Sequence, residues 1–334
     1  MMRQERVSFH IIWKILVALL PILFGMPTVA MVICAYNIAM TILCLGPVTA
    51  LIASLCAILI SMFFCGTYGE TAKLQGLFIG LEAAMCGIMC AYAIIKKKGF
   101  YNGVLLSGGA FLILSFTEIY NTALKAGMSV AQFLTGMPME LFKMQIASLT
   151  ESGVNIPTET IDTLIDTIGR IAVMMVPSIL VISSLAVGYG VMWLVTAQMR
   201  RLPVGITHSF AKVRLPKTAV VFMVLSFALF FISPEGKFSY IFLNALIVLA
   251  AVSFFAGMSF VDFYLRRILK STPIRIIIHI FVFLFSTVFS GVSPYVNLFV
   301  VYILLASVDA FKNFRKIGKE EEGGEPNEAE EREN

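Results

Sequence analysis

Long apolar runs limit the fold of this chain more than any other feature. Residues 47–65 contain no Asp, Glu, Lys, Arg or His, and comparable runs recur along most of the sequence. Hydrophobic residues make up 59% of the chain and charged residues only 13%, whereas about a quarter of the residues of a soluble domain are charged. The chain has too few charged side chains to cover the surface of a water-soluble fold. The sequence therefore predicts an integral membrane protein and excludes nucleic-acid binding as its main role.

The apolar runs predict an all-α fold, a polytopic transmembrane helix bundle. Because a helix needs about 20 apolar residues to cross the hydrocarbon core, we expect about ten spans, with about eight as the next best number. The predicted spans cover residues 11–25, 27–44, 47–65, 74–95, 102–124, 171–199, 218–233, 238–265, 274–291 and 294–312. Pro21, Gly25 and Pro27 interrupt the first two, which form either two short spans or one broken or re-entrant element.

The distribution of lysine and arginine predicts how the spans are oriented. Lysines 96–98 follow the fourth span, and further basic residues gather in 200–217, 266–275 and 312–316. The alternating loops are poor in positive charge or mixed. Because short loops rich in Lys and Arg stay in the cytoplasm, we expect both termini there, in a multi-pass protein of the bacterial cytoplasmic membrane. The first apolar run continues into further spans, so it is expected to be an uncleaved helix.

The chain divides into a transmembrane helical domain, residues 1–318, and an acidic tail, residues 319–334. The tail holds eight glutamates against Lys319 and Arg332. A like-charged block with glycine and proline cannot bury apolar surface. We therefore expect residues 319–334 to be disordered and cytoplasmic, either as a solubilising end or as a segment that binds partners.

One loop, residues 125–169, is long and is expected on the outer side. Apolar residues recur at helical spacing after Phe133, although Gly136 and Pro138 interrupt this first pattern. A second apolar pattern follows Pro157, with acidic residues on the opposite side. The loop is therefore predicted to form two amphipathic helices on the membrane surface or over the bundle. They serve either as a lid over an outward-facing pocket or as a structural cap on the helix ends.

The inner loop, residues 200–217, places cations beside apolar residues at the lipid boundary. Each cation can gain about 1 kcal/mol near anionic head groups, although a topology signal alone also explains the loop. The candidate contacts with lipid or with a cytoplasmic partner are Arg200, Arg201, Arg214, Asp309 and Arg315. Asp262 and Arg266 lie four residues apart and are expected to form a structural pair within one helix.

Polar residues within the predicted spans are the candidates for ligand contacts. A carboxylate in hydrocarbon is costly, so it usually faces a cavity or a partner. Glu82 lies near the middle of the fourth span. Glu118 lies in the outer half of the fifth span with Asn121 close by, and Asn37 lies within the second. Each is either a ligand or proton site or a structural group, such as a protonated Glu82 bonded to a neighbouring helix.

No residue pattern indicates catalysis or a bound cofactor. The three histidines are scattered along the chain and form no pair of nucleophile and base. The sequence holds no phosphate-binding loop, no H-E-x-x-H and no G-x-S-x-G. The six cysteines fall in apolar runs, where a free thiol acts as a small hydrophobe. We therefore expect a protein that is not an enzyme and uses no metal or cofactor; an intramembrane enzyme with carboxylates as acid and base is the third alternative.

Four segments together resemble a known family. They are GIMCAYAIIKKKG (87–99), SFAKVRLPK (209–217), FAGMSFVDFYLRR (255–267) and VDAFKNFRK (308–316). The second is similar to a Phe…Arg-Leu-Pro pattern before a span, and the fourth to a closing Asp…Phe-Arg pattern, here Asp309, Phe314 and Arg315. In this order the segments resemble the YybS-like family, a domain-of-unknown-function group of bacterial multi-spanning membrane proteins.

The resemblance implies a transport role. The membrane region of YybS-like proteins is distantly similar to the substrate-binding components of energy-coupling-factor vitamin transporters. That similarity implies a small-molecule pocket open to the outside and an ATPase-type partner in the cytoplasm. This chain has more predicted spans than those components and no recognisable substrate motif. The leading hypothesis is a non-enzymatic component that binds or transports a small solute, and the alternative is a membrane scaffold or regulator that binds cytoplasmic partners.

Overall fold

The computed structural model describes residues 13–134, 158–199, 210–232, 237–290 and 298–315, together with Gly136 and Met144. All regular elements in these ranges are helices, which confirms the all-α fold. The chain folds as two compact units, Met1–His208 and Ser209–Asn334, here named unit 1 and unit 2.

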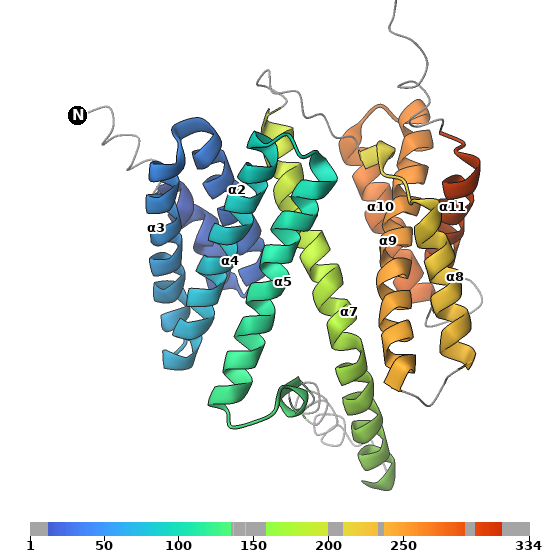
Figure 1. Ribbon diagram of the computed structural model, residues 1–334, viewed down its shortest axis with the longest axis horizontal. Helices are drawn as coiled ribbons and strands as arrows, with labels where there is room; N and C mark the ends of the chain where they lie inside the picture. Colours follow the sequence, from blue (N-terminus) through green and yellow to red (C-terminus); the bar gives the residue numbers. More distant parts are fainter. Residues whose placement is uncertain are drawn as a thin grey trace, which may run out of the picture. The chain divides into compact units, whose positions relative to one another are not determined.

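Unit 1 contains, in its described residues, a short 3-10 helix and five long α-helices. They are η1 (Leu20–Phe24), α2 (Pro27–Leu45), α3 (Pro47–Gly66), α4 (Glu70–Ile95), α5 (Phe100–Lys125) and α7 (Thr158–Met199). Short turns join the helices from α2 to α5, so neighbours along the chain run antiparallel (Figure 1). α4 packs against α2, α3 and α5, and α7 completes the bundle against α5 and α2.

The first part of unit 1 breaks where the sequence predicts a break. Pro21 lies in the first turn of η1, and Gly25 ends this helix with a φ of 71°. A residue without a Cβ atom adopts this left-handed conformation readily. Pro27 then starts α2, because proline fits the first helical turn, where its missing N–H would have no partner. Residues 13–24 and α2 are thus separate helical elements.

Close contact between α3 and α4 depends on two glycines. A Cβ atom at Gly76 would overlap the backbone of Ser61 and Met62, and one at Gly80 would overlap the backbone of Ile58. The pair therefore lets two apolar helices approach each other closely, as small-xxx-small motifs do in membranes. This contact positions α4, which carries Glu82.

The outer surface of unit 1 is apolar. Leu59 and Phe63 of α3 and Ile113 of α5 are largely exposed, whereas Ile38 and Met192 are completely buried. Large apolar side chains on the outside are expected where the surrounding solvent is lipid.

The long helix α7 corrects one expectation. The sequence predicts a separate amphipathic helix after Pro157, but Thr158–Met199 form one continuous helix of 42 residues that also contains the span predicted at 171–199. A single glycine, here Gly169, weakens a helix without ending it, so nothing stops propagation between the two patterns. At about 1.5 Å per residue the helix is about 63 Å long, about twice the hydrocarbon thickness. Its first part projects beyond the end of α5 (Figure 1).

Unit 2 contains, in its described residues, one short helix and four longer ones. They are η2 (Phe210–Lys212), α8 (Lys217–Ile232), α9 (Lys237–Ile268), α10 (Thr272–Ser290) and α11 (Leu298–Lys312). α9 packs against α8, α11 and η2, and the helices reverse direction along the chain (Figure 1). One end of the unit is therefore built from residues 210–217, 259–275 and 309–315, and it is named the polar end.

Six helices in the described ranges have the length and hydropathy of membrane spans. These spans are Pro27–Leu45, Pro47–Gly66, Ala72–Ile95, Phe100–Lys125, Met174–Met199 and Phe238–Ile268. Shorter apolar helices cover Trp13–Phe24, Lys217–Ile232 and Thr272–Val282. With α11, every predicted span contains a helix, which confirms a polytopic membrane bundle. The helix predicted after Phe133 lies largely outside the described residues, and the tail at 319–334 lies wholly outside them.

Candidate functional site

Unit 1 contains a pocket between α2, α4 and α5, named the unit 1 pocket. Its volume is about 260 Å³. The wall consists of Pro27, Thr28 and Met31 from α2, Gln75, Ile79 and Glu82 from α4, and Phe111, Ser115 and Glu118 from α5. Residues three or four apart share a face of a helix, so each of the three helices turns one face toward the same space.

Glu82 is the most deeply buried charged residue of this wall. The residue is 5% exposed and lies midway along α4. Ser115 Oγ, on α5, donates a hydrogen bond to Glu82 Oε1 at 2.7 Å. The bond to a neighbouring helix is what a structural role predicts, and the position in a pocket wall is what a ligand-binding role predicts. Glu82 meets both descriptions at once.

Glu118 lies three residues after Ser115 on α5 and is half-buried. The structure thus brings Glu82 and Glu118 to one pocket. None of the nine residues in the wall is basic. The pocket therefore has two carboxylates and no positive charge of its own.

The two asparagines predicted together with these glutamates lie elsewhere. Asn37 Nδ2 donates a hydrogen bond to the carbonyl oxygen of Ile33 within α2, at 3.1 Å. Asn121 Nδ2 donates one to the carbonyl oxygen of Thr117 within α5, at 2.9 Å. Neither residue lines the pocket. Their amides instead bond to their own helices, as short polar side chains can.

Neither carboxylate of the pocket has a cationic partner in the part of the chain that the structure describes. No described lysine or arginine forms an ion pair with Glu82 or Glu118. An intramembrane carboxylate without such a partner is costly and marks a functional site by default. The pocket can therefore hold a proton or a positively charged group. In the part of the chain that the structure describes, no group of three His, Cys, Asp or Glu side chains could hold a metal ion.

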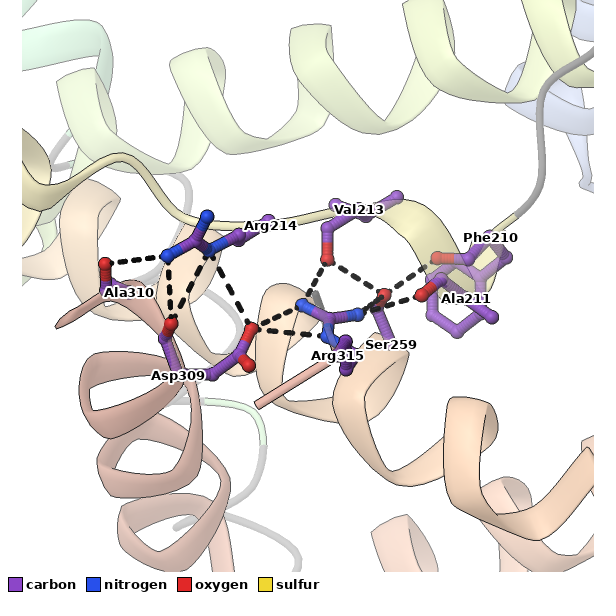
Figure 2. A network of polar contacts seen from close by, with 8 residues as sticks. All are labelled: Phe210, Ala211, Val213, Arg214, Ser259, Asp309, Ala310 and Arg315. Carbon is purple, nitrogen blue, oxygen red and sulfur yellow. Dashed lines mark hydrogen bonds and ion pairs between the residues drawn. The ribbon is translucent and has the colours of Figure 1, made fainter. Parts of the chain in front are cut away.

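Buried charges are arranged differently in unit 2. At the polar end, the fully buried Asp309 pairs with Arg315, whose Nη2 and Nε lie 2.7 and 3.0 Å from Asp309 Oδ2 (Figure 2). Arg315 Nη1 donates to the carbonyl oxygen of Ala211 at 2.7 Å, and Nη2 donates to that of Val213 at 2.8 Å. This guanidinium therefore ties the end of α11 to the segment before α8.

Two further side chains complete this group of contacts, named the Asp309 network. Ser259 Oγ, on α9, accepts a hydrogen bond from Arg315 Nη1 at 2.9 Å. Arg214 donates from Nε and Nη2 to the carbonyl oxygens of Asp309 and Ala310, at 2.9 to 3.3 Å. These carbonyls lie in the last turn of α11, where few intrahelical partners remain. Arg214 thus caps the helix, and the network joins three segments that are distant in sequence.

Asp262 forms a second network at the polar end. Its Oδ2 lies 2.8 Å from Arg266 Nε, which confirms the predicted pair within one helix. Its Oδ1 lies 2.9 Å from Arg275 Nε of α10, and Arg275 also donates to two carbonyl oxygens in the turn after α9. His279 is buried beside this pair, with Nε2 4.0 Å from Asp262 Oδ1. The network fastens α10 to the end of α9.

The structure separates the five residues predicted to contact lipid or a cytoplasmic partner. Asp309 and Arg315 are buried and bonded to each other, so their side chains present almost no surface to another molecule. Arg214 keeps 24% of its side chain exposed. Arg200 and Arg201 lie outside the described residues.

Three residues that connect these groups to neighbouring helices, Ser115, Ser259 and Arg275, are missed by the sequence analysis. Serine is common in membrane helices and often bonds to its own backbone, so its presence alone is no signal. The spacing of the two serines from carboxylates does provide a signal. Ser115 lies three residues before Glu118, and Ser259 lies three residues before Asp262, so each serine shares a helix face with a carboxylate.

Comparison with known proteins places the chain in a family. A family described as "Predicted membrane protein (DUF2232)" matches residues 8–293. The chain belongs to this family. No curated protein and no solved structure shows a significant match to the chain. Membership agrees with the helices of membrane-spanning length in the described residues.

Proposed function

We propose that this family member is a non-enzymatic membrane component that binds and helps to transport a small, positively charged solute in the unit 1 pocket. The observation that carries the proposal is Glu82, which is 5% exposed and lines a cavity without a cationic partner among the described residues. Carboxylates of this kind within a membrane mark ligand or ion pathways.

The size and charge of the pocket define the class of solute. Its volume of about 260 Å³ is just below the range of about 300–1,000 Å³ for ligand pockets, which favours a small molecule. Glu82 and Glu118 supply negative charge, and the ring of Phe111 can attract a cation. Gln75 and Thr28 add neutral polar groups. A small organic amine combines the features that this wall can recognise.

The distribution of charge supports an outward-facing pocket. Gln75, Ile79 and Glu82 lie in the first half of α4, whereas lysines 96–98 follow its other end. Short loops rich in lysine stay in the cytoplasm, which would put the pocket in the outer half of the membrane. The chain is then a multi-pass protein of the bacterial cytoplasmic membrane, with both termini inside.

Energy for transport comes from outside this chain in the proposed mechanism. The sequence holds no phosphate-binding loop, so an ATPase-type partner or an ion gradient drives the step. The chain resembles YybS-like proteins, and through them the substrate-binding components of energy-coupling-factor transporters. This resemblance favours the ATPase-type partner over the ion gradient. The chain itself supplies the pocket and the charge that holds the solute.

Native mass spectrometry of the detergent-purified protein tests the proposal. The wild type is expected to carry a bound molecule of low mass. Glu82→Gln should lower its occupancy at least tenfold, because a lost hydrogen bond to a charged group removes about 1.5–3 kcal/mol. Glu118→Gln should lower the occupancy by a smaller factor, since Glu118 is only half-buried.

Two matched variants separate ligand binding from general damage to the fold. Asn37→Leu and Asn121→Leu each remove a polar side chain from a span without touching the pocket wall. The bound mass should persist in both. An unchanged bound mass in Glu82→Gln, or a wild type without any small molecule, would refute the proposal.

A membrane scaffold or regulator is the alternative function. Its candidate contacts among the described residues reduce to Arg214, because Asp309 and Arg315 are buried and bonded to each other. Deletion of residues 319–334 distinguishes the two functions. The scaffold would be favoured if this deletion abolished the co-purifying proteins while Glu82→Gln left the properties of the protein unchanged.

A further inference from the structure

A second pocket lies at the polar end of unit 2 and is independent of the proposed function. Its volume is about 200 Å³. The wall consists of Arg214, Leu215, Pro216 and Lys217, which lead into α8, and Ala310 of α11. Two of these five residues are cationic and none is acidic. This wall is the opposite of the unit 1 pocket in charge.

Arg214 is held in place while one of its nitrogens stays available. Nε and Nη2 donate to the carbonyl oxygens of Asp309 and Ala310. Nη1 has no hydrogen-bond partner in the described residues, and Figure 2 shows one guanidinium nitrogen turned away from the network. Because its helix-capping bonds already fix the guanidinium, little side-chain entropy is lost when an anion binds.

The positive charge of this pocket is not cancelled by the nearby carboxylate. Asp309 Oδ2 lies 2.7 Å from Arg315 Nη2 but 3.9 Å from Arg214 Nε, so its charge is balanced mainly by Arg315. Lys217 is exposed and forms no ion pair with any described residue. Arg214 and Lys217 therefore leave the pocket with two cations to share with a ligand.

Apolar surface adjoins the pocket on both helices. Val221 and Phe222, one turn into α8, are 57% and 60% exposed. Phe311 of α11, next to Ala310, is also largely exposed. Cations at the end of lipid-facing helices suit an amphiphile with an anionic head and apolar tails, whereas a free phosphate ion would gain nothing from the apolar surface.

We infer that this pocket binds the phosphate head group of an anionic phospholipid. Arg214 Nη1 and Lys217 Nζ donate to the phosphate oxygens, and the acyl chains lie along the exposed apolar faces of α8 and α11. The bonds that hold Arg214 against α11 thereby also position it for the lipid.

Native mass spectrometry with added lipid tests the inference. The purified full-length protein is titrated with phosphatidylglycerol, with phosphatidylcholine, and with phosphatidylglycerol in the presence of an equal concentration of inorganic phosphate. Phosphatidylglycerol should bind more tightly than phosphatidylcholine, and inorganic phosphate should not displace it. Lys217→Gln should weaken phosphatidylglycerol binding about fivefold, the contribution of one basic residue near an anionic surface.

A matched control removes a lysine at the same end of unit 2. Lys270 is exposed and does not line the pocket, so Lys270→Gln should leave binding unchanged. Equal weakening by Lys217→Gln and Lys270→Gln would show unspecific attraction to surface charge and overturn the inference. Displacement of phosphatidylglycerol by inorganic phosphate would overturn the assignment to a lipid. Lys217→Gln leaves every bond of the Asp309 network intact, so the outcome does not depend on a damaged fold.

Discussion

The two units of this protein treat buried carboxylates in opposite ways. In unit 2, Asp262 and Asp309 each lie 2.7 to 2.9 Å from the nitrogen atoms of arginines. In unit 1, Glu82 is as buried as Asp262, at 5% exposure, but it bonds to the hydroxyl of Ser115 and faces a cavity. Unit 2 uses charge to fasten helix ends and turns, whereas the function proposed above leaves Glu82 of unit 1 for another molecule.

This difference predicts how the carboxylates of the two units respond when they are neutralised. When one member of a buried ion pair is removed, the other is left uncompensated in a poorly solvating environment. When a carboxylate without a counter-ion is neutralised, no buried cation is left without its partner. The same change from acid to amide should therefore destabilise unit 2 and leave the stability of unit 1 nearly unaltered.

Asp309→Asn should have the largest effect on stability. It leaves the guanidinium of Arg315 buried without a carboxylate, and we expect a loss of about 3–5 kcal/mol in the free energy of unfolding. Reversible unfolding in mixed micelles measures this loss. The double variant Asp309→Asn/Arg315→Gln should recover part of it, because no charge is left unpaired. Wild-type stability of the single variant would break the comparison between the units.

Asp262→Asn should have a smaller effect, a loss of about 1.5–3 kcal/mol. The side chain of Arg266 is 39% exposed and stays solvated without its partner. Arg275 is buried and loses its carboxylate, but its guanidinium keeps its hydrogen bonds to the turn after α9. The same unfolding experiment measures this change, and a larger loss than that of Asp309→Asn would contradict the ranking by burial.

Ser115→Ala should destabilise unit 1 by about 0.6 kcal/mol, the average for hydrogen bonds between membrane helices, and by no more than about 1.7 kcal/mol, the largest value found for them. The change removes the single hydroxyl that bonds to Glu82 Oε1 across α4 and α5. Thr117→Val serves as the control, because Thr117 bonds only to the backbone of its own helix. Equal stability of Ser115→Ala and wild type would remove the structural part of the role assigned to Glu82.

Glu82→Gln should have the smallest effect on stability, a change below about 0.6 kcal/mol. The amide oxygen can still accept the hydrogen bond from Ser115, and no cation loses its partner. A small change in unfolding free energy together with a lost bound molecule would sharpen the comparison most. A loss as large as that of Asp309→Asn would instead reveal an ion pair that the proposed role excludes.

The sequence predicts the spans because an apolar run of about 20 residues has one solution in lipid, a helix. It fails at 158–199, where the amphipathic pattern and the apolar pattern belong to one helix. Periodicity shows which faces are apolar, but only a stop signal separates two helices, and Gly169 is too weak to act as one.

The candidate site was predictable in part. Glu82 and Glu118 follow from the cost of charge within a membrane, and the structure brings them to one pocket. Asn37 and Asn121 satisfy the same rule, but an amide can bond to the carbonyl four residues earlier and needs no partner elsewhere. The pairing of Asp309 with Arg315 does not follow from such rules. The two residues are six positions apart, and Arg315 lies beyond the end of α11, so helical periodicity does not place them on one face.

The contacts of Arg315 have a consequence for the order in which unit 2 matures. Ala211 and Arg315 are separated by 104 positions, which takes about 5–20 s to translate at roughly 5–20 residues per second. Throughout that interval the carbonyl oxygen of Ala211 lacks this partner, whereas that of Val213 can already accept a hydrogen bond from Ser259 Oγ. The contacts of Arg315 with Ala211 and Val213, which tie the end of α11 to the segment before α8, can therefore form only after residue 315 has been synthesised.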